Sequence, residues 1–267
     1  MSRRHASLAS HAVLAALVLT LAWGTFAFGA VYEWAFRPLA AAAGLVGTAS
    51  LILHRRVTPP LRSFALACAG IVCAGALQLV PLPDAVLSSV SPGTTSFLSR
   101  YDLSFTAERT PSPLDDAPPA RRNRPISIAP DLTQRALFLF TAFALLACGT
   151  AALASAISAR PLVHALVGLG VVLAVVGIGQ EVTLGRVQHM LVYGFWKTQE
   201  HAEPFGPFIN RNHFAGWMVM AIPLALAMMV ERVDRAVPLE HLGGRELLRV
   251  LTLSLIHISE PTETRED

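Results

Sequence analysis

The sequence predicts an all-α protein, a polytopic bundle of transmembrane helices. Hydrophobic residues make up 53% of the 267 residues and charged residues only 15%, whereas a soluble domain carries roughly 25% charged residues. The charges are also segregated between apolar runs that reach the length of a spanning helix, about 20 residues. Residues 6–32 contain no Asp, Glu, Lys or Arg, so the polar face of a soluble helix cannot be drawn there.

Six complete spans and the start of a seventh follow from these runs. The spans are predicted at residues 9–31, 37–54, 62–81, 134–157, 161–181 and 212–230. A seventh apolar segment begins near Leu247. Arg3 and Arg4 precede the first run, as in a signal peptide. That run is longer than a typical signal-peptide core and more spans follow, so we predict an uncleaved first helix. Residues 1–252 are therefore assigned to one transmembrane helical domain.

The orientation follows from Lys and Arg in short connections, which remain in the cytoplasm. The arginines before the first span and after the second, fourth and sixth spans are Arg3, Arg4, Arg55, Arg56, Arg62, Arg160, Arg232, Arg235 and Arg245. All fall on one side when the spans are counted. The chain is therefore predicted to be a multi-pass protein of the bacterial inner membrane with a cytoplasmic N-terminus. The long connections 82–133 and 182–211 are then periplasmic, and the first is expected to be irregular because it is rich in Pro, Ser, Asp and Arg.

Composition also argues against several classes of site. The net charge of +3 arises from dispersed basic residues near helix ends, so no nucleic-acid partner is predicted. The cysteines Cys68, Cys73 and Cys148 lie inside predicted spans and are interpreted as small buried residues. Glu200, His201 and Glu203 are close in sequence, but no second His or Cys group is spaced for zinc. No phosphate-binding loop, GxSxG or HExxH motif is present. No metal and no cofactor are predicted.

The candidate binding residues precede or begin the sixth span: Asn210, Arg211, Asn212 and His213. Asn is a favoured N-cap residue, and a helix N-terminus carries partial positive charge and unpaired N–H groups. Arg211 and His213 add charge, and arginine can bind two phosphate oxygens at once. The pattern favours an anion site at the periplasmic boundary between the inner membrane and water, such as one for a lipid-linked diphosphate. The alternative interpretation is structural, with Arg211 reaching to the interface and the asparagines only capping the helix.

A resemblance to a known family rests on three stretches. They are residues 206–216 (GPFINRNHFAG) followed by 221–225 (AIPLA), residues 78–83 (QLVPLP) and residues 125–131 (PISIAPD). Together they resemble the O-antigen ligase and O-antigen polymerase family over about residues 10–250. The first stretch is the most specific, and the other similarities are mainly of hydropathy and order.

The resemblance implies a metal-independent membrane glycosyltransferase. Such an enzyme transfers a glycan from a polyprenyl-diphosphate carrier to an acceptor glycan, lipid or protein on the periplasmic face. It also implies that Arg211 is one of the arginines near the diphosphate. The family's essential histidine belongs to a later outer loop that has no counterpart in this chain, so the catalytic residues remain unknown.

The end of the sequence predicts an incomplete protein. Residues 253–262 (LSLIHISEPT) resemble the translation of a sequencing adaptor. The segment that starts near Leu247 also runs into a Pro, Thr, Glu and Asp tail before it is long enough to span a bilayer. We therefore expect residues 253–267 to be a non-native tail, and the chain to be the N-terminal part of a longer protein.

Two other functions remain open at the level of sequence. A transporter or flippase would place ionisable residues along a path through the membrane, and the predicted spans have none near their centres. A polytopic membrane protein without catalysis is the other alternative.

Overall fold

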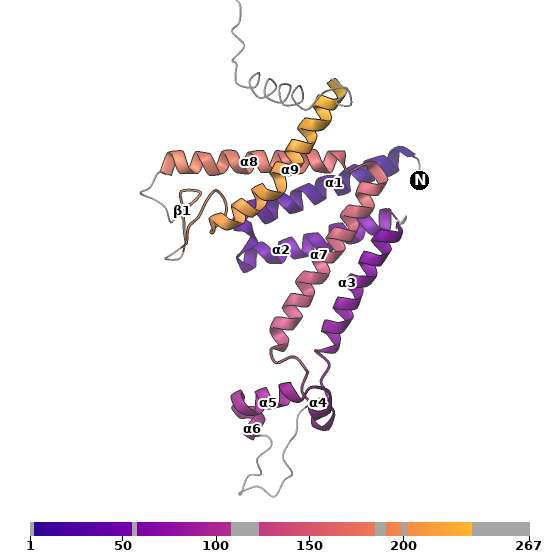
Figure 1. Ribbon diagram of the computed structural model, residues 1–267, viewed down its shortest axis with the longest axis vertical. Coiled ribbons are helices and arrows are strands. Elements are labelled where there is room, and N and C mark those ends of the chain that lie inside the picture. Colours follow the sequence, from indigo (N-terminus) through magenta and orange to yellow (C-terminus); the bar gives the residue numbers. More distant parts are fainter. Residues whose placement is uncertain (1–2, 55–57, 108–122, 185–190, 199–201, 237–267) are drawn as a thin grey trace, which may run out of the picture. The chain divides into compact units, whose positions relative to one another are not determined.

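A computed structural model describes residues 3–54, 58–107, 123–184, 191–198 and 202–236 (Figure 1). The chain forms two compact units, residues 1–159 and residues 160–267. Each unit is described by itself below. The start of the predicted seventh span at Leu247 and the predicted non-native tail 253–267 lie outside the described residues.

Six long helices account for most of the described chain. They are α1 (Arg3–Phe26), α2 (Glu33–Leu53), α3 (Pro59–Leu77), α7 (Pro130–Ile157), α8 (Arg160–Leu184) and α9 (Arg211–Ala236). By length and composition, each is long and apolar enough to cross a bilayer. Each overlaps one of the six predicted spans, so the prediction of an all-α multi-pass membrane protein is confirmed.

The first span ends five residues earlier than predicted, at Phe26 instead of residue 31. The chain then turns through a short 3₁₀ segment, η1 (Phe28–Ala30), in which Phe28, Gly29 and Ala30 have φ values of 59°, 65° and 54°. Only glycine adopts this left-handed conformation without a steric penalty. Aromatic packing stabilises the turn, because the buried Phe28 ring contacts Tyr32 and Trp34 at centroid distances of 5.8 and 5.9 Å.

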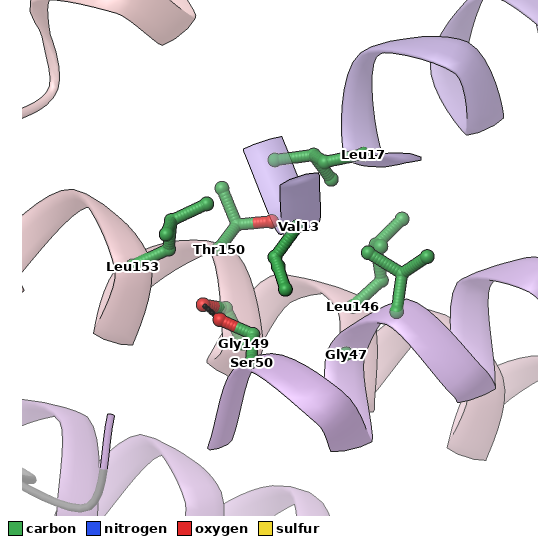
Figure 2. A pocket seen from close by; sticks show the side chains of 9 residues that line it. Val13, Leu17, Gly47, Ser50, Leu146, Gly149, Thr150 and Leu153 are labelled. Atoms are coloured by element: carbon green, nitrogen blue, oxygen red, sulfur yellow. Dashed lines mark hydrogen bonds between the residues drawn. The ribbon is translucent and has the colours of Figure 1, made fainter. Parts of the chain in front are cut away.

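Close backbone contact joins α2 to α7 in the first unit, where Gly47, Ser50 and Gly149 lie together (Figure 2). A Cβ atom on Gly149 would lie 2.5 Å from the Gly47 carbonyl oxygen, and one on Gly47 would overlap the backbone of Leu145. The Ser50 hydroxyl donates a 2.6 Å hydrogen bond to the Gly149 carbonyl oxygen. Small residues and inter-helix hydrogen bonds are the usual means by which membrane helices associate. Leu17 of α1 is fully buried against this crossing.

A histidine connects α1 with the end of α2. His54 Nδ1 donates to the Ser50 carbonyl oxygen at 3.1 Å, because a carbonyl can only accept. The other ring nitrogen, Nε2, lies 3.0 Å from the Ser10 hydroxyl oxygen. Both ring nitrogens therefore have partners, which fixes the imidazole at the C-terminal end of α2.

The expectation that residues 82–133 are irregular is wrong for residues 84–107. They form three short helices, α4 (Asp84–Val90), α5 (Pro92–Tyr101) and α6 (Leu103–Ala107). We call these the α4–α6 unit. Its buried large apolar residues are Leu87, Leu98 and Phe105, one on each helix. These few large side chains bury enough surface to order a segment whose average composition suggests disorder. Residues 108–122, which hold the proline cluster, lie outside the described residues.

Arg124 and Asp102 hold the α4–α6 unit together. Arg124 Nη1 lies 2.8 Å from Asp102 Oδ2, and the guanidinium carbon lies 5.1 Å from the centroid of the Phe105 ring. The Ser104 hydroxyl donates a 2.6 Å hydrogen bond to Asp102 Oδ1. The pKa of Asp102 is lowered, first by that hydrogen bond and further by backbone N–H groups and Arg124.

The second unit contains α8, α9 and a small hairpin. The hairpin strands are β1 (Leu191–Val192) and β2 (Trp196–Lys197), which pair antiparallel. The two helices approach where a Cβ on Gly170 would lie 2.9 Å from Ala221 Cβ. Near the C-terminal end of α9, Glu231 Oε1 accepts hydrogen bonds from Arg160 Nη2 at 2.7 Å and from Arg235 Nη2 at 2.6 Å.

Candidate functional site

The predicted binding residues follow a tight turn at residues 205–208. The Phe205 N–H donates to the Phe208 carbonyl oxygen at 3.0 Å, and the reverse bond is 3.2 Å long. The first central residue, Gly206, has a φ of 57°, and proline at the second cannot have a positive φ. This combination is typical of a type II′ turn, which favours glycine at its first central position.

Gly177 of α8 provides the space into which this turn packs. A Cβ on Gly206 would lie 3.3 Å from Gly177 Cα, and a Cβ on Gly177 would overlap the Phe205 ring. Phe214, in the first turn of α9, contacts the Phe205 ring at a centroid distance of 4.6 Å and the Phe208 ring at 6.4 Å. The turn is therefore held against both α8 and α9, and it determines where α9 begins.

Asn210 caps α9, as its residue type predicts, and the helix begins at Arg211 rather than at residue 212. The Asn212 N–H donates to Asn210 Oδ1 at 2.8 Å, and the His213 N–H donates to the Asn210 carbonyl oxygen at 3.0 Å. The Arg211 N–H donates to the Glu203 carbonyl oxygen at 2.8 Å. The first three helical N–H groups therefore have partners within the chain. Recognition of an anion here would depend on side chains more than on the unpaired amides that the sequence suggested.

The structure places all four predicted side chains at the surface. Asn210, Arg211, Asn212 and His213 are each exposed. Arg211 Nη2 lies 2.8 Å from Glu203 Oε2, and the two side chains are 66% and 63% exposed. A guanidinium group has five N–H donors in a planar fork, so one carboxylate leaves it able to bind a second anion. The arrangement can bind phosphate oxygens if Glu203 is displaced or if the ligand binds beside it.

Glu203 was not expected to be the partner of Arg211. In the sequence, Glu203 was considered only with Glu200 and His201, as part of a possible metal site. The ion pair could have been anticipated from Gly206 and Pro207, two structure-breaking residues that lie between Glu203 and Arg211. A tight turn brings the residues on either side of it together.

A second residue that the sequence did not single out for this site is Gln180, near the end of α8. Its Nε2 donates to the Leu191 carbonyl oxygen at 3.3 Å, and its Oε1 accepts from the Tyr193 N–H at 3.1 Å. The hairpin is thereby fixed to α8. Tyr193 and Gly194 both have positive φ values, 56° and 78°, as in the primed turns of two-stranded hairpins. Burial raises the pKa of Tyr193 to about 12.

Among the residues that the structure describes, no group of three or more His, Cys, Asp or Glu side chains lies close enough to hold a metal ion. Glu200 and His201, which adjoin Glu203 in sequence, lie outside the described residues. Cys68, Cys73 and Cys148 all line an apolar cavity of about 340 Å³ between α2, α3 and α7. Only Cys148 is buried as predicted, whereas Cys68 is partly exposed and Cys73 is exposed.

Comparisons with protein-family models, with curated proteins and with solved structures gave no match for this chain. The resemblance to the O-antigen ligase and polymerase family therefore rests on the residues quoted for it.

Proposed function

We propose that this chain is part of a bacterial inner-membrane glycosyltransferase of the O-antigen ligase or polymerase type. The enzyme would transfer a glycan from a polyprenyl-diphosphate carrier to an acceptor glycan, lipid or protein on the periplasmic face. The observation that carries the proposal is the exposed group of Arg211, His213 and two asparagines at the start of a span-length helix. This group lies directly after a turn that is packed rigidly against α8 and α9.

In the reaction, an acceptor hydroxyl oxygen would attack the anomeric carbon of the carrier-linked sugar. The bond between that carbon and the diphosphate oxygen breaks, and the carrier diphosphate leaves with the electron pair. The hydroxyl proton passes to a base that we do not assign to this chain. Arg211 would stabilise the negative charge that develops on the leaving diphosphate, because a donor oriented in advance costs little reorganisation in the transition state.

Glu203 has a clear place in this proposal. Its carboxylate contacts the same guanidinium that would bind a phosphate oxygen. Both groups are oxyanions that accept from a guanidinium fork, and a diphosphate carries more negative charge than one carboxylate. Glu203 would therefore hold Arg211 in position while the site is empty and yield to the carrier diphosphate when it binds.

The test is substitution of Arg211 in the complete protein, followed by measurement of glycan transfer in membranes. Arg211→Ala and Arg211→Lys should both reduce transfer, because lysine has the charge but not the planar fork. The matched control is Arg235→Ala, since Arg235 lies on the same helix, is 59% exposed and is also paired with a glutamate. Unchanged transfer in both Arg211 variants, with normal membrane insertion, would remove Arg211 from the mechanism.

The alternative is a transporter, a flippase or a membrane protein without catalysis. In the described parts of the six long helices, Asp, Glu, Lys and Arg occur only near the ends. A transport path would place such residues near the middle of the membrane. Normal glycan transfer together with loss of carrier translocation in the Arg211 variants would favour a flippase over the transferase.

A further inference from the structure

The α4–α6 unit carries apolar side chains that its own core does not use. Val86 and Val90 of α4 are exposed, as are Phe97 and Tyr101 of α5 and Leu103 of α6. Each pair within α4 and α5 is spaced by four residues, so its members lie on the same face of the helix. The rings of Phe97 and Tyr101 contact each other at a centroid distance of 4.9 Å. α4 and α5 therefore each present an exposed apolar face beside the buried side chain of Leu87 or Leu98, and α6 adds Leu103.

Backbone and side-chain hydrogen bonds fix this unit to the ends of α3 and α7. The Ser127 N–H donates to the Gln78 carbonyl oxygen at 3.0 Å, directly after α3 and directly before α7. Leu82 and Arg124 exchange backbone hydrogen bonds of 2.9 and 3.0 Å. The Thr94 hydroxyl donates to the Ile126 carbonyl oxygen at 2.9 Å. The three short helices thus lie just beyond neighbouring ends of two span-length helices (Figure 1).

The exposed apolar surface is continuous in sequence with the lipid-facing surface of those helices. Leu77 at the end of α3 is 66% exposed, and Leu132 in the first turn of α7 is 64% exposed. Val80 and Ile128, in the segments that lead to and from the α4–α6 unit, are exposed as well. An apolar patch this extensive is unusual on a surface that faces only water.

We propose that the α4–α6 unit lies in the lipid–water boundary of the bilayer. Its exposed apolar residues are buried among the headgroups and first acyl carbons of the leaflet next to the ends of α3 and α7. The partner is the phospholipid surface itself, and the attachment is apolar. The charges in the described residues 84–107 and 123–129 balance, with Asp84 and Asp102 against Arg100 and Arg124. Binding therefore needs no anionic lipid. This proposal is independent of the proposed enzymatic function.

The test uses cysteine variants of the full chain in phosphatidylcholine nanodiscs that hold one chain each. Val90→Cys and Phe97→Cys probe the proposed buried face. Ser88→Cys and Ser99→Cys are matched controls, because by helical spacing they lie opposite on the same two helices and are also exposed. The parent chain, with its three native cysteines, gives the background reaction with a water-soluble maleimide.

Cysteines at positions 90 and 97 should react about tenfold more slowly than those at 88 and 99, because lipid would shield these thiols from the water-soluble reagent. A bimane label at 90 or 97 should be quenched by nitroxide lipids that are labelled close to the headgroup, and 1 M salt should not reverse the protection. Equal reaction rates at the four positions would overturn the proposal. So would protection that salt abolishes, or protection seen only when several chains share one membrane, since the latter would mean that a second copy covers the face.

Discussion

Arg211 and Glu203 contact each other twice, once through their side chains and once through their backbones. The Nη2–Oε2 distance and the N–O distance are both 2.8 Å. The backbone bond fixes the position of the first residue of α9, while the side-chain contact places the guanidinium. The two contacts can be separated by substitution, because a glutamine at position 203 retains the backbone carbonyl and removes the negative charge.

Glu203→Gln should therefore strengthen binding of the carrier diphosphate in the complete protein. A surface ion pair contributes about 0–1 kcal/mol, so removal of the competing carboxylate should lower KM for the lipid-linked donor by up to about fivefold. Initial rates of glycan transfer at varied donor concentration measure this. In an Arg211→Ala background the substitution should have no effect on KM. A higher KM in Glu203→Gln would mean that the carboxylate assists binding instead of competing with it.

Gly177→Ala should displace the turn that precedes α9. A Cβ at this position overlaps the Phe205 ring, and overpacking of this kind costs about 1–3 kcal/mol. Glycan transfer by the complete protein should fall as the start of α9 moves. Gly179→Ala is the matched control on the same helix, because a Cβ there meets no atom within 4 Å. Equal activity in the two variants would show that the packing of the turn on α8 is not needed.

The crossing of α2 and α7 should tolerate no added methyl group. Gly149→Ala and Gly47→Ala should each lower the free energy of unfolding by about 1–3 kcal/mol, because backbone atoms cannot move aside as a flexible side chain can. Gly44→Ala, also on α2, adds a Cβ to open space and should change stability by less than about 0.5 kcal/mol. Unfolding by SDS titration of the chain in micelles compares the three. A similar loss in Gly44→Ala would argue against the close approach.

Acid should weaken the α4–α6 unit. The pKa of Asp102 in the folded protein is below its ordinary value of 3.8, so its ionised form stabilises the folded unit. That contribution is fully present above the unfolded pKa and is lost as the pH falls through the lower, folded pKa. At neutral pH, limited proteolysis should cleave residues 84–107 faster in Asp102→Asn than in the parent chain. The difference should disappear in strong acid. A difference that persists unchanged there would mean that the ionised carboxylate is not its source.

The sequence allows the long helices to be predicted because one physical requirement, the thickness of the bilayer, determines their length and composition. It does not allow the end of α1 to be predicted, because Phe28 and Ala30 are residues that rarely adopt positive φ. Their conformation depends on the packing of Phe28 against Tyr32 and Trp34, which is a tertiary effect. The α4–α6 unit was missed because average composition hides three well-spaced core side chains.

At the candidate site, the cap was predictable and the ion pair was not. Asn210 and Asn212 both have the residue type of a cap and both precede the apolar run that begins at Phe214, so local rules place the cap to within two residues. The contact between Glu203 and Arg211 requires the turn at Gly206 and the space left by Gly177, and neither follows from local propensity. The roles proposed for Asn212 and His213 stay predictions, since the structure shows only that their side chains are exposed.

The proposed role of Arg211 requires that the start of α9 face the periplasm. Asn212→Cys and Ala159→Cys each add one probe at an exposed position, and the predicted topology puts the two positions on opposite sides of the membrane. The parent chain, with its three native cysteines, gives the background labelling. A membrane-impermeant maleimide applied to cells with a permeable outer membrane and an intact inner membrane should label position 212. It should label position 159 only after the inner membrane is broken. If position 212 reacts only after the inner membrane is broken, the start of α9 is cytoplasmic and Arg211 cannot meet a periplasmic diphosphate.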